Sequence, residues 1–568
     1  MRVSRFALLV LTSAAVFAQP ADLVLRNGKI VTMNAGAPVV QALAVRGDRI
    51  TALGPDSQAA QWIGPATKVI DLHGRLAIPG FIEGHGHFTG LGEFRLGLDL
   101  REARTWDDIV AQVARAAKQA KPGEWIIGRG WHQSKWDRAP DPNVEGFPLH
   151  ASLDKVSPNN PVLLTHASGH AAFVNSKALE ASGITRDTPN PSGGELLKDK
   201  DGNPTGLLRE TAQGLAGRAH NAWLAKRTPQ EKAAEDRKII DLATDDSLAN
   251  GITTFEDAGS SFATVDGLKK LAEAGALKLR MWVMLSGSQP NLEANLDKYR
   301  MIGVGQNHLT VRAIKQYMDG ALGSRGAWLL EPYTDKPDSV GLPTQDPANI
   351  KKTGDAAIRH GYQLCVHAIG DRANREVLNV YEQVFREHPD QKDLRWRIEH
   401  AQHLSAADIP RFGKLGVIAA MQAVHCTSDA PYVPLRLGDK RAEEGAYVWQ
   451  KLMKSGAIVG NGTDAPVESV SPLASFYAAV SRKTKDGKVF YPDQRMSREE
   501  ALRSYTMNNA YAAFEDKLKG SLETGKLADI TVLSRDIMTI PEDEILSTDV
   551  LYTIVGGKVM YESAARGR

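Results

Sequence analysis

The sequence contains very few cysteines and almost no net charge. Cys365 and Cys426 are the only cysteines among 568 residues, and neither lies in a CxxC pattern. Two cysteines in a chain of this length do not form a disulfide scaffold, so we interpret them as buried thiols, with pairing as the alternative. Lys and Arg total 69 against 67 Asp and Glu. This balance gives no electrostatic attraction to nucleic acid or to anionic membranes.

Long hydrophobic runs are missing too, except at the start. Arg2 and Arg5 precede an apolar run over 6–17, with small residues at Val16 and Ala18. This pattern predicts a secretory signal peptide, residues 1–18, and export to the periplasm or medium. A buried strand or a membrane anchor is the alternative, but the run is shorter than the roughly 20 residues of a membrane span. We expect no membrane attachment once the peptide is removed.

Both ends of the mature chain alternate apolar and polar residues in short segments. Examples are "ADLVLRNGKIVTMN" near the start and "VLYTIVGGKVMYES" near the end, with turn residues between such runs. The pattern is typical of β-hairpins. We predict one composite β-sandwich built from residues 19–79 and 511–568, and two unrelated β-caps are the alternative.

The middle of the chain, residues 80–510, alternates strand-like apolar runs with helical stretches. Such alternation indicates βα units around a parallel sheet. Eight candidate strands predict an α/β TIM barrel, with an insertion at about 101–249. One candidate ends at His85, and the others begin at Gly251, Leu277, Leu309, Tyr362, Leu394, Gly416 and Ala457.

Potential metal ligands stand at the ends of several of these strands. His85 and His87 point to the same side because side chains alternate along a strand, and Gly84 and Gly86 leave room beside them. Barrel enzymes place their chemistry at the carboxyl ends of the strands, and imidazole and carboxylate are good ligands for divalent ions. Each residue alone could be an ordinary polar side chain, but together they predict a metal centre. The other candidates are Lys315, His367, His400, His403 and Asp464.

Longer motifs carry a family resemblance. The motifs "PGFIEGHGH", "KQYMDGALGSRGA", "VHAIGDRAN", "RIEHAQH" and "NGTDAPV" resemble those of the metal-dependent amidohydrolase superfamily, in its YtcJ-like branch, which includes N-substituted formamide deformylases. The similarity runs over essentially the whole mature chain. One departure is Glu83-Gly84, where many relatives carry Asp-Ser.

The resemblance implies a TIM barrel, a sandwich from both termini, and one or two divalent ions, zinc first. His85 and His87 would bind one ion, and His367 and His400 the other. Lys315 would be carboxylated and bridge the two, since a free ammonium has no lone pair; a salt bridge to Asp319 or Asp464 is the alternative. Asp464 would be the general base and a possible ligand. We prefer His400 over His403 because His400 ends the apolar strand.

The resemblance therefore implies hydrolysis of an amide or related C–N bond in a small molecule, by water whose pKa the ion lowers to about 7. His170, Arg325, His425 and Trp131 are candidate substrate contacts, although each could be structural, Arg325 by pairing with Asp319. The alternatives are a lactone or ester hydrolase, a deaminase or lyase, or a silent exported binding protein. A nicotinamide dehydrogenase is poorly supported, because no GxGxxG follows a strand. We expect a small-molecule partner and no nucleic acid, and a homodimer is one possible assembly.

Overall fold

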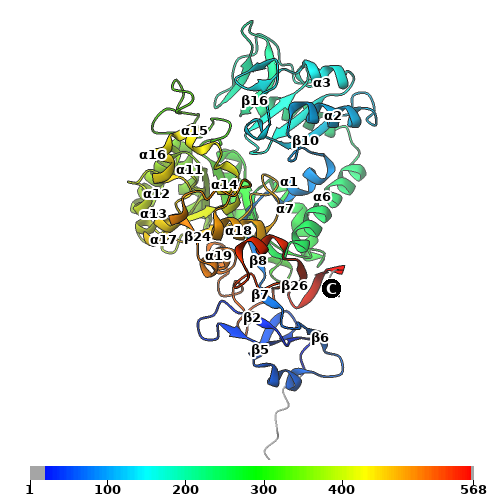
Figure 1. Cartoon of the computed structure of the whole chain (residues 1–568), viewed down its shortest axis with the longest axis vertical. Coiled ribbons are helices and arrows are strands. Elements are labelled where there is room, and N and C mark those ends of the chain that lie inside the picture. The colour runs from blue at the N-terminus through cyan, green and yellow to red at the C-terminus, as the bar shows by residue number, and fades with distance from the viewer. Residues whose placement is uncertain (1–19, 565–568) are drawn as a thin grey trace, which may run out of the picture.

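The computed structural model describes residues 20–564, so the predicted signal peptide lies outside the described residues. Three parts are stacked along the long axis of the molecule (Figure 1): a β-sandwich, a barrel, and a module above the barrel mouth. Within residues 20–564, no helix is long and apolar enough to span a bilayer.

Eight parallel strands form the barrel, and every neighbouring pair in the order β8-β17-β18-β20-β21-β22-β23-β24 is hydrogen-bonded. This confirms the predicted TIM barrel. The first and last strands are joined by a side chain, because the Asn509 amide donates to Ile82 O at 2.8 Å and to Asn461 O at 2.7 Å. The strands are β8 (Phe81–Gly86), β17 (Ile252–Ser260), β18 (Arg280–Ser286), β20 (Leu309–Tyr317), β21 (Gln363–Ala368), β22 (Arg397–His400), β23 (Ile418–Met421) and β24 (Val459–Asn461).

The sandwich combines both ends of the chain, as predicted. β25 (Ile530–Leu533) pairs antiparallel with β7 (Leu76–Pro79) in a six-stranded sheet. The strand order of this sheet is β27 (Lys558–Glu562), β26 (Val550–Val555), β25, β7, β2 (Lys29–Val31) and β3 (Val39–Val40). A second sheet comes from the N-terminal segment alone, in the order β5 (Arg49–Gly54), β4 (Ala42–Arg46), β1 (Leu23–Arg26) and β6 (Lys68–Asp71). Apolar side chains of both segments share one core, among them Leu25, Ile30 and Ile554. Burial of this shared core holds the two ends together.

A mixed six-stranded sheet fills most of the predicted insertion. It contains β9 (Leu98–Asp99), β10 (Ile126–Trp131), β13 (Val162–His166), β14 (Ala171–Val174), β15 (Gly194–Lys198) and β16 (Pro204–Glu210). We call residues 98–224 the upper module. After it, α6 (Pro229–Ala249) packs beside the barrel on α1 (Phe88–Leu96). A Cβ at Gly92 would lie 2.1 Å from Ile239 O, so only glycine permits this close approach of the two helices.

Candidate metal centre

The two histidines of the GHGH segment meet a carboxylate from the other side of the barrel closure. His85 lies on β8 and is fully buried, whereas His87 follows the strand. Asp464 follows β24, the strand next to β8. His87 Nε2 is 3.1 Å and His85 Nε2 is 3.6 Å from Asp464 Oδ1. The backbone N–H of Asp464 also donates to His85 O at 2.7 Å, which fixes the two strand ends against each other.

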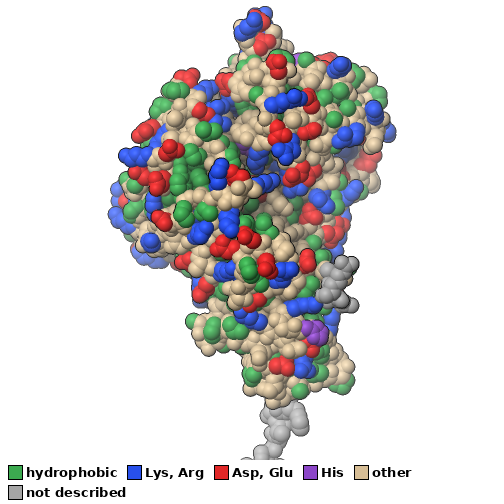
Figure 2. All heavy atoms as spheres, viewed as in Figure 1, with side chains coloured by type: hydrophobic (Ala, Val, Ile, Leu, Met, Phe, Trp, Pro, Cys, Tyr) green, Lys and Arg blue, Asp and Glu red, His purple; other side chains and the backbone are tan. Residues whose placement is uncertain are grey.

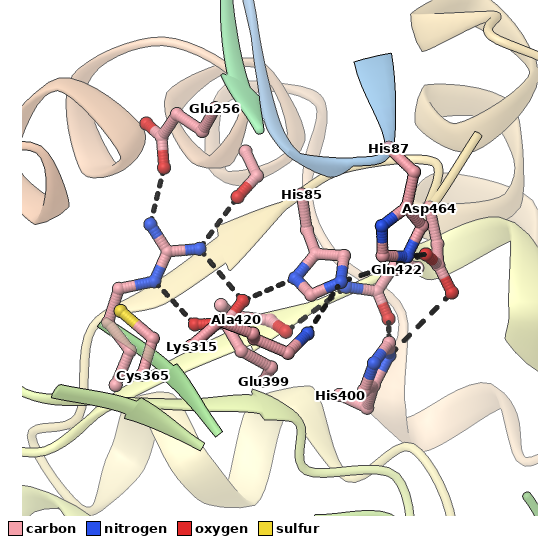
Figure 3. Close-up of polar contacts among 12 residues, drawn as sticks. His85, His87, Glu256, Lys315, Cys365, Glu399, His400, Ala420, Gln422 and Asp464 are labelled. Atoms are coloured by element: carbon pink, nitrogen blue, oxygen red, sulfur yellow. Dashed lines mark hydrogen bonds and ion pairs between the residues drawn. The ribbon is translucent and has the colours of Figure 1, made fainter. Parts of the chain in front are cut away.

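A buried charge network orients His85 (Figure 3). Its Nδ1 donates to Glu399, so Nε2 faces Asp464 and Lys315. Glu399 is itself held by Arg397, whose guanidinium also contacts Glu256 and donates to Gly84 O at 2.7 Å. A carboxylate on the far nitrogen fixes the tautomer of a ligating histidine and makes it a better ligand.

His400 completes the tightest cluster. Single ligand atoms of His85, His400 and Asp464 lie within 4.8 Å of one another, and all three residues are buried. His400 Nδ1 donates to Gln422 Oε1 at 2.8 Å. His400 and Asp464 both have left-handed backbones, with φ of 76° and 57°. Such conformations cost about 1–3 kcal/mol each in a non-glycine residue and gather at functional sites.

Lys315 lies beside this cluster without a carboxylate partner. It is 1% exposed, and Nζ is 3.5 Å from His85 Nε2. Among the described residues no carboxylate oxygen lies within ion-pairing distance of Nζ. The salt bridge to Asp319 considered above is therefore not formed, because Asp319 instead accepts backbone N–H groups from Trp328, Ile369 and Gly370 at 2.8–2.9 Å. Burial lowers the pKa of Lys315, and a neutral amine is the form that reacts with CO2.

His367 and His170 bring the barrel and the upper module together. The ring centroid of His367 lies 4.5 Å from that of His400 and 4.9 Å from that of His170. His367 Nε2 is buried without a hydrogen-bond partner. His170 Nδ1 donates to Glu210 Oε2 at 2.7 Å. Any Cβ at Gly320 or Gly326 would lie within 2.2 Å of the Glu210 carboxylate, so the loop after β20 is shaped around this pair.

The histidines are electrostatically prepared to bind a cation. Burial and the nearby Lys315 lower the pKa of His85 to about 4, and burial holds the pKa values of His367 and His400 well below the usual range. Burial alone would raise the pKa of Asp464, but its hydrogen bond with His87 and the nearby His400 and His85 hold it well below the usual range. At neutral pH the site therefore offers neutral imidazoles and an ionised carboxylate, the ligand forms that a metal needs.

A cavity opens from this cluster between the barrel and the upper module, and the empty space there, open solvent included, is about 510 Å³. Figure 2 shows the surface hollowed between these two parts. Of the predicted substrate contacts, His170 and His425 line the cavity. Gln402 Nε2 donates to His425 Nδ1 at 2.9 Å, which leaves His425 Nε2 protonated, 3.9 Å from Asp464 Oδ2.

Three other predicted residues lie elsewhere. Trp131 packs in the core of the upper module and donates to Leu164 O at 2.8 Å, whereas its neighbour His132, which the sequence did not single out, lines the cavity. Arg325 pairs with Asp335 at 2.9 Å and not with Asp319. His403 is buried outside the cavity lining, with neither ring nitrogen hydrogen-bonded.

Two further residues were missed from the sequence although they touch the centre. Glu399 and Gln422 bond His85 and His400. The signal for Glu399 was present, because "RIEH" places Arg397 and Glu399 two apart inside an apolar strand, where a pair of charges needs partners.

A parallel barrel that gathers imidazoles, a lysine and a carboxylate at its mouth has the architecture of a metal-dependent hydrolase. Comparisons with known proteins agree: residues 68–561 match the amidohydrolase family, and the chain belongs to this family. The putative amidohydrolase YtcJ of Bacillus subtilis is 31% identical over 95% of this chain and 99% of its own. N-substituted formamide deformylase of Arthrobacter pascens is 29% identical over 96% and 99%.

The structural comparison extends over the same length. The crystal structure of an uncharacterized metal-dependent hydrolase from Pyrococcus horikoshii superimposes with a TM-score of 0.73 at 26% identity, and the match covers 92% of this chain and 99% of that one. The amidohydrolase family and its YtcJ-like branch, inferred above from motifs, are thus confirmed.

Proposed function

We propose that the protein hydrolyses an amide or related C–N bond of a small molecule, using one or two divalent ions, zinc in the first place. The observation that carries this proposal is the buried convergence of His85, His400 and Asp464 within 4.8 Å. His87, Lys315 and His367 would complete the ligand set.

The residues present fit such an ion. His367 Nε2 is a buried nitrogen without a hydrogen bond, 3.6 Å from Asp319 Oδ1, and Lys315 is a buried amine without a counter-ion. Leaving such groups unsatisfied is costly unless a ligand completes them. A carbamate on Lys315 would turn the amine into two oxygen ligands, and its nearness to His85 supports this role.

A bound divalent ion supplies acidified water and polarises the substrate carbonyl. Asp464 would accept the proton of the attacking water and return it to the leaving nitrogen. The protonated Nε2 of His425, 3.9 Å from Asp464 Oδ2, is placed to donate to the oxyanion that develops on the carbonyl. Glu399 keeps His85 in the tautomer that ligation needs.

The preference for a C–N bond rests on the likeness to the formamide deformylase. We would therefore test a panel of N-formyl amines, N-acyl amines, lactones and esters with metal-loaded protein, and measure released amine and acid. Cleavage of an N-formyl or N-acyl amine is expected. Cleavage of esters alone, or ammonia release without an acid, would contradict this assignment.

The metal itself is tested by elemental analysis of the purified protein and of His85→Ala, with His73→Ala as the matched control, because His73 is an exposed histidine of the sandwich. The wild type and the control should carry metal and lose activity with chelator, whereas His85→Ala should lose its metal. Metal-free wild type would contradict the proposal. For Lys315, intact-protein mass and metal content should both rise when metal is loaded in bicarbonate rather than in CO2-depleted buffer.

A further inference from the structure

Asp429 is a carboxylate on the cavity wall that has no cationic partner. It ends α14 (Ala423–Asp429), the helix that also carries His425. The Tyr432 hydroxyl donates to one of its oxygens, and the Tyr447 hydroxyl donates to the other at 2.5 Å. Within residues 20–564, no Lys, Arg or His nitrogen lies within 4.0 Å of either oxygen. Both donors to Asp429 are thus neutral.

The position is an unfavourable one for a negative charge. Carboxylates are disfavoured at the C-terminal end of a helix, and half-buried charges are usually paired. Burial raises the pKa of Asp429, and His425, the two tyrosine hydroxyls and the more distant Lys135 oppose this rise. The hydroxyls fix the carboxylate in place while each oxygen keeps a lone pair for another donor.

The other charges of the outer cavity do not neutralise Asp429. Glu468, also in the lining, adds a second carboxylate. Lys135 is the one lysine or arginine among the cavity-lining residues, and it is exposed at the rim without an ion pair to Asp429. The outer cavity therefore carries an excess of negative charge that a positively charged ligand would balance.

Asp429 lies about one helical turn from His425, which faces the metal centre. His425 and Asp429 are four residues apart on one helix, so their side chains stand about 5–6 Å apart on the same face. His425 Nε2 is 3.9 Å from Asp464 Oδ2. A ligand group bound to Asp429 thus lies roughly one helical turn from the carbonyl that His425 and Asp464 would face.

We propose that the substrate carries a positively charged nitrogen, about one helical turn from the bond that is cleaved, and that Asp429 binds this nitrogen. The inference rests on the proposed function, because it names the substrate class of the same cavity. It would make the protein an enzyme for acylated or formylated amines with a second, cationic amino group.

Three short alkyl hydroxamates test this without relying on turnover. The hydroxamate group chelates the metal and is expected not to be cleaved. It fixes one end of each probe at the metal centre, so differences in affinity between the tails report on the outer cavity. The tails end in an ammonium, a methyl group or a carboxylate, and affinity is measured calorimetrically on wild-type protein with verified metal content. We expect the ammonium probe to bind about tenfold more tightly than the methyl probe, the typical gain from a hydrogen bond to a charged group, and the carboxylate probe to bind weakest.

Asp429→Asn keeps an oxygen for the tyrosines but loses the charge, so the ammonium preference should fall to within about twofold while the methyl probe binds as before. Asp439→Asn is the matched control, since it removes an exposed carboxylate outside the cavity and should preserve the preference. Lys135→Met should leave the preference for the ammonium probe unchanged or increase it.

Equal binding of all three probes to the wild type would overturn the proposal. A preference for the carboxylate probe, or an equal loss of affinity for all three probes in Asp429→Asn, would overturn it too. The wild-type series is decisive by itself if the variant does not fold, and failure of every amide in the substrate panel would leave this result standing.

Discussion

The two ends of the barrel strands differ in whether their buried functional groups find hydrogen-bond partners within the protein. At the amino ends, Arg280 begins β18 and Arg397 begins β22, and each hydrogen-bonds through all three guanidinium nitrogens. Arg280 joins the barrel to the sandwich through Asp529, at 2.7 and 3.0 Å. These charges are deeply buried and satisfied by protein groups alone.

At the carboxyl ends, buried polar groups are left incomplete. His367 and His425 each keep an Nε2 without a hydrogen bond. His400 and Asp464 at this end also have left-handed backbones. The two arginines of the lower end are thus fully hydrogen-bonded within the protein, whereas the mouth leaves an imidazole acceptor, on His367, and an imidazole N–H donor, on His425, available to a ligand.

Removing the acid at the mouth should give the largest effect on activity. In Asp464→Asn the side chain can still coordinate through its amide oxygen but cannot accept a proton. We expect kcat to fall by about a hundredfold to ten-thousandfold, the range for general-base loss, with metal still bound. Steady-state kinetics and metal analysis check this together. Retained turnover would remove Asp464 as the base.

Breaking the ion pair at the lower end should cost stability and leave the site intact. Asp529→Asn leaves the Arg280 charge buried without compensation, which typically costs about 3–5 kcal/mol. Urea unfolding measures the loss, and metal affinity should change less than about twofold. Asp48→Asn is the control in the same sandwich, because its pair with Arg49 is exposed and should contribute at most about 1 kcal/mol. A large drop in metal affinity in Asp529→Asn would show that the two ends are not independent.

Glu399 connects the two ends of the barrel, because its carboxylate accepts hydrogen bonds from Arg397 at the lower end and from His85 at the mouth. Glu399→Gln should weaken metal binding about tenfold to a hundredfold, the usual effect of losing a carboxylate behind a ligating histidine. Competition with a chromogenic chelator gives the affinity. Glu256→Gln is the control, because Glu256 contacts the same arginine without touching His85. If both variants lose metal equally, the effect comes from Arg397 and not from the orientation of His85.

Much of this arrangement was readable from the sequence. All eight strands were predicted because apolar runs with β-branched residues alternate with helices. The candidate ligands were singled out because each lies near the end of such a run or just after it. The upper module was not readable in the same way. Trp131 and His132 are adjacent, and strand alternation sends one into the module core and the other to the cavity. Which one faces the cavity depends on how the module sits on the barrel, and that is set by distant contacts such as Glu210 against Gly320.

Substitution of Arg325, which lies outside the cavity lining, has the smallest expected effect and tests how far the mouth extends. Arg325 lies after β20 with φ of 63° and pairs with Asp335, which Arg436 also contacts. Because Asp335 keeps Arg436 and the pair is only partly buried, Arg325→Met should cost at most about 1 kcal/mol in urea unfolding. We expect kcat and KM to stay within about twofold of the wild type. A raised KM at unchanged kcat would instead mean that Arg325 leaves Asp335 to bind substrate, and the incompletely paired region of the mouth would then extend to the loop after β20.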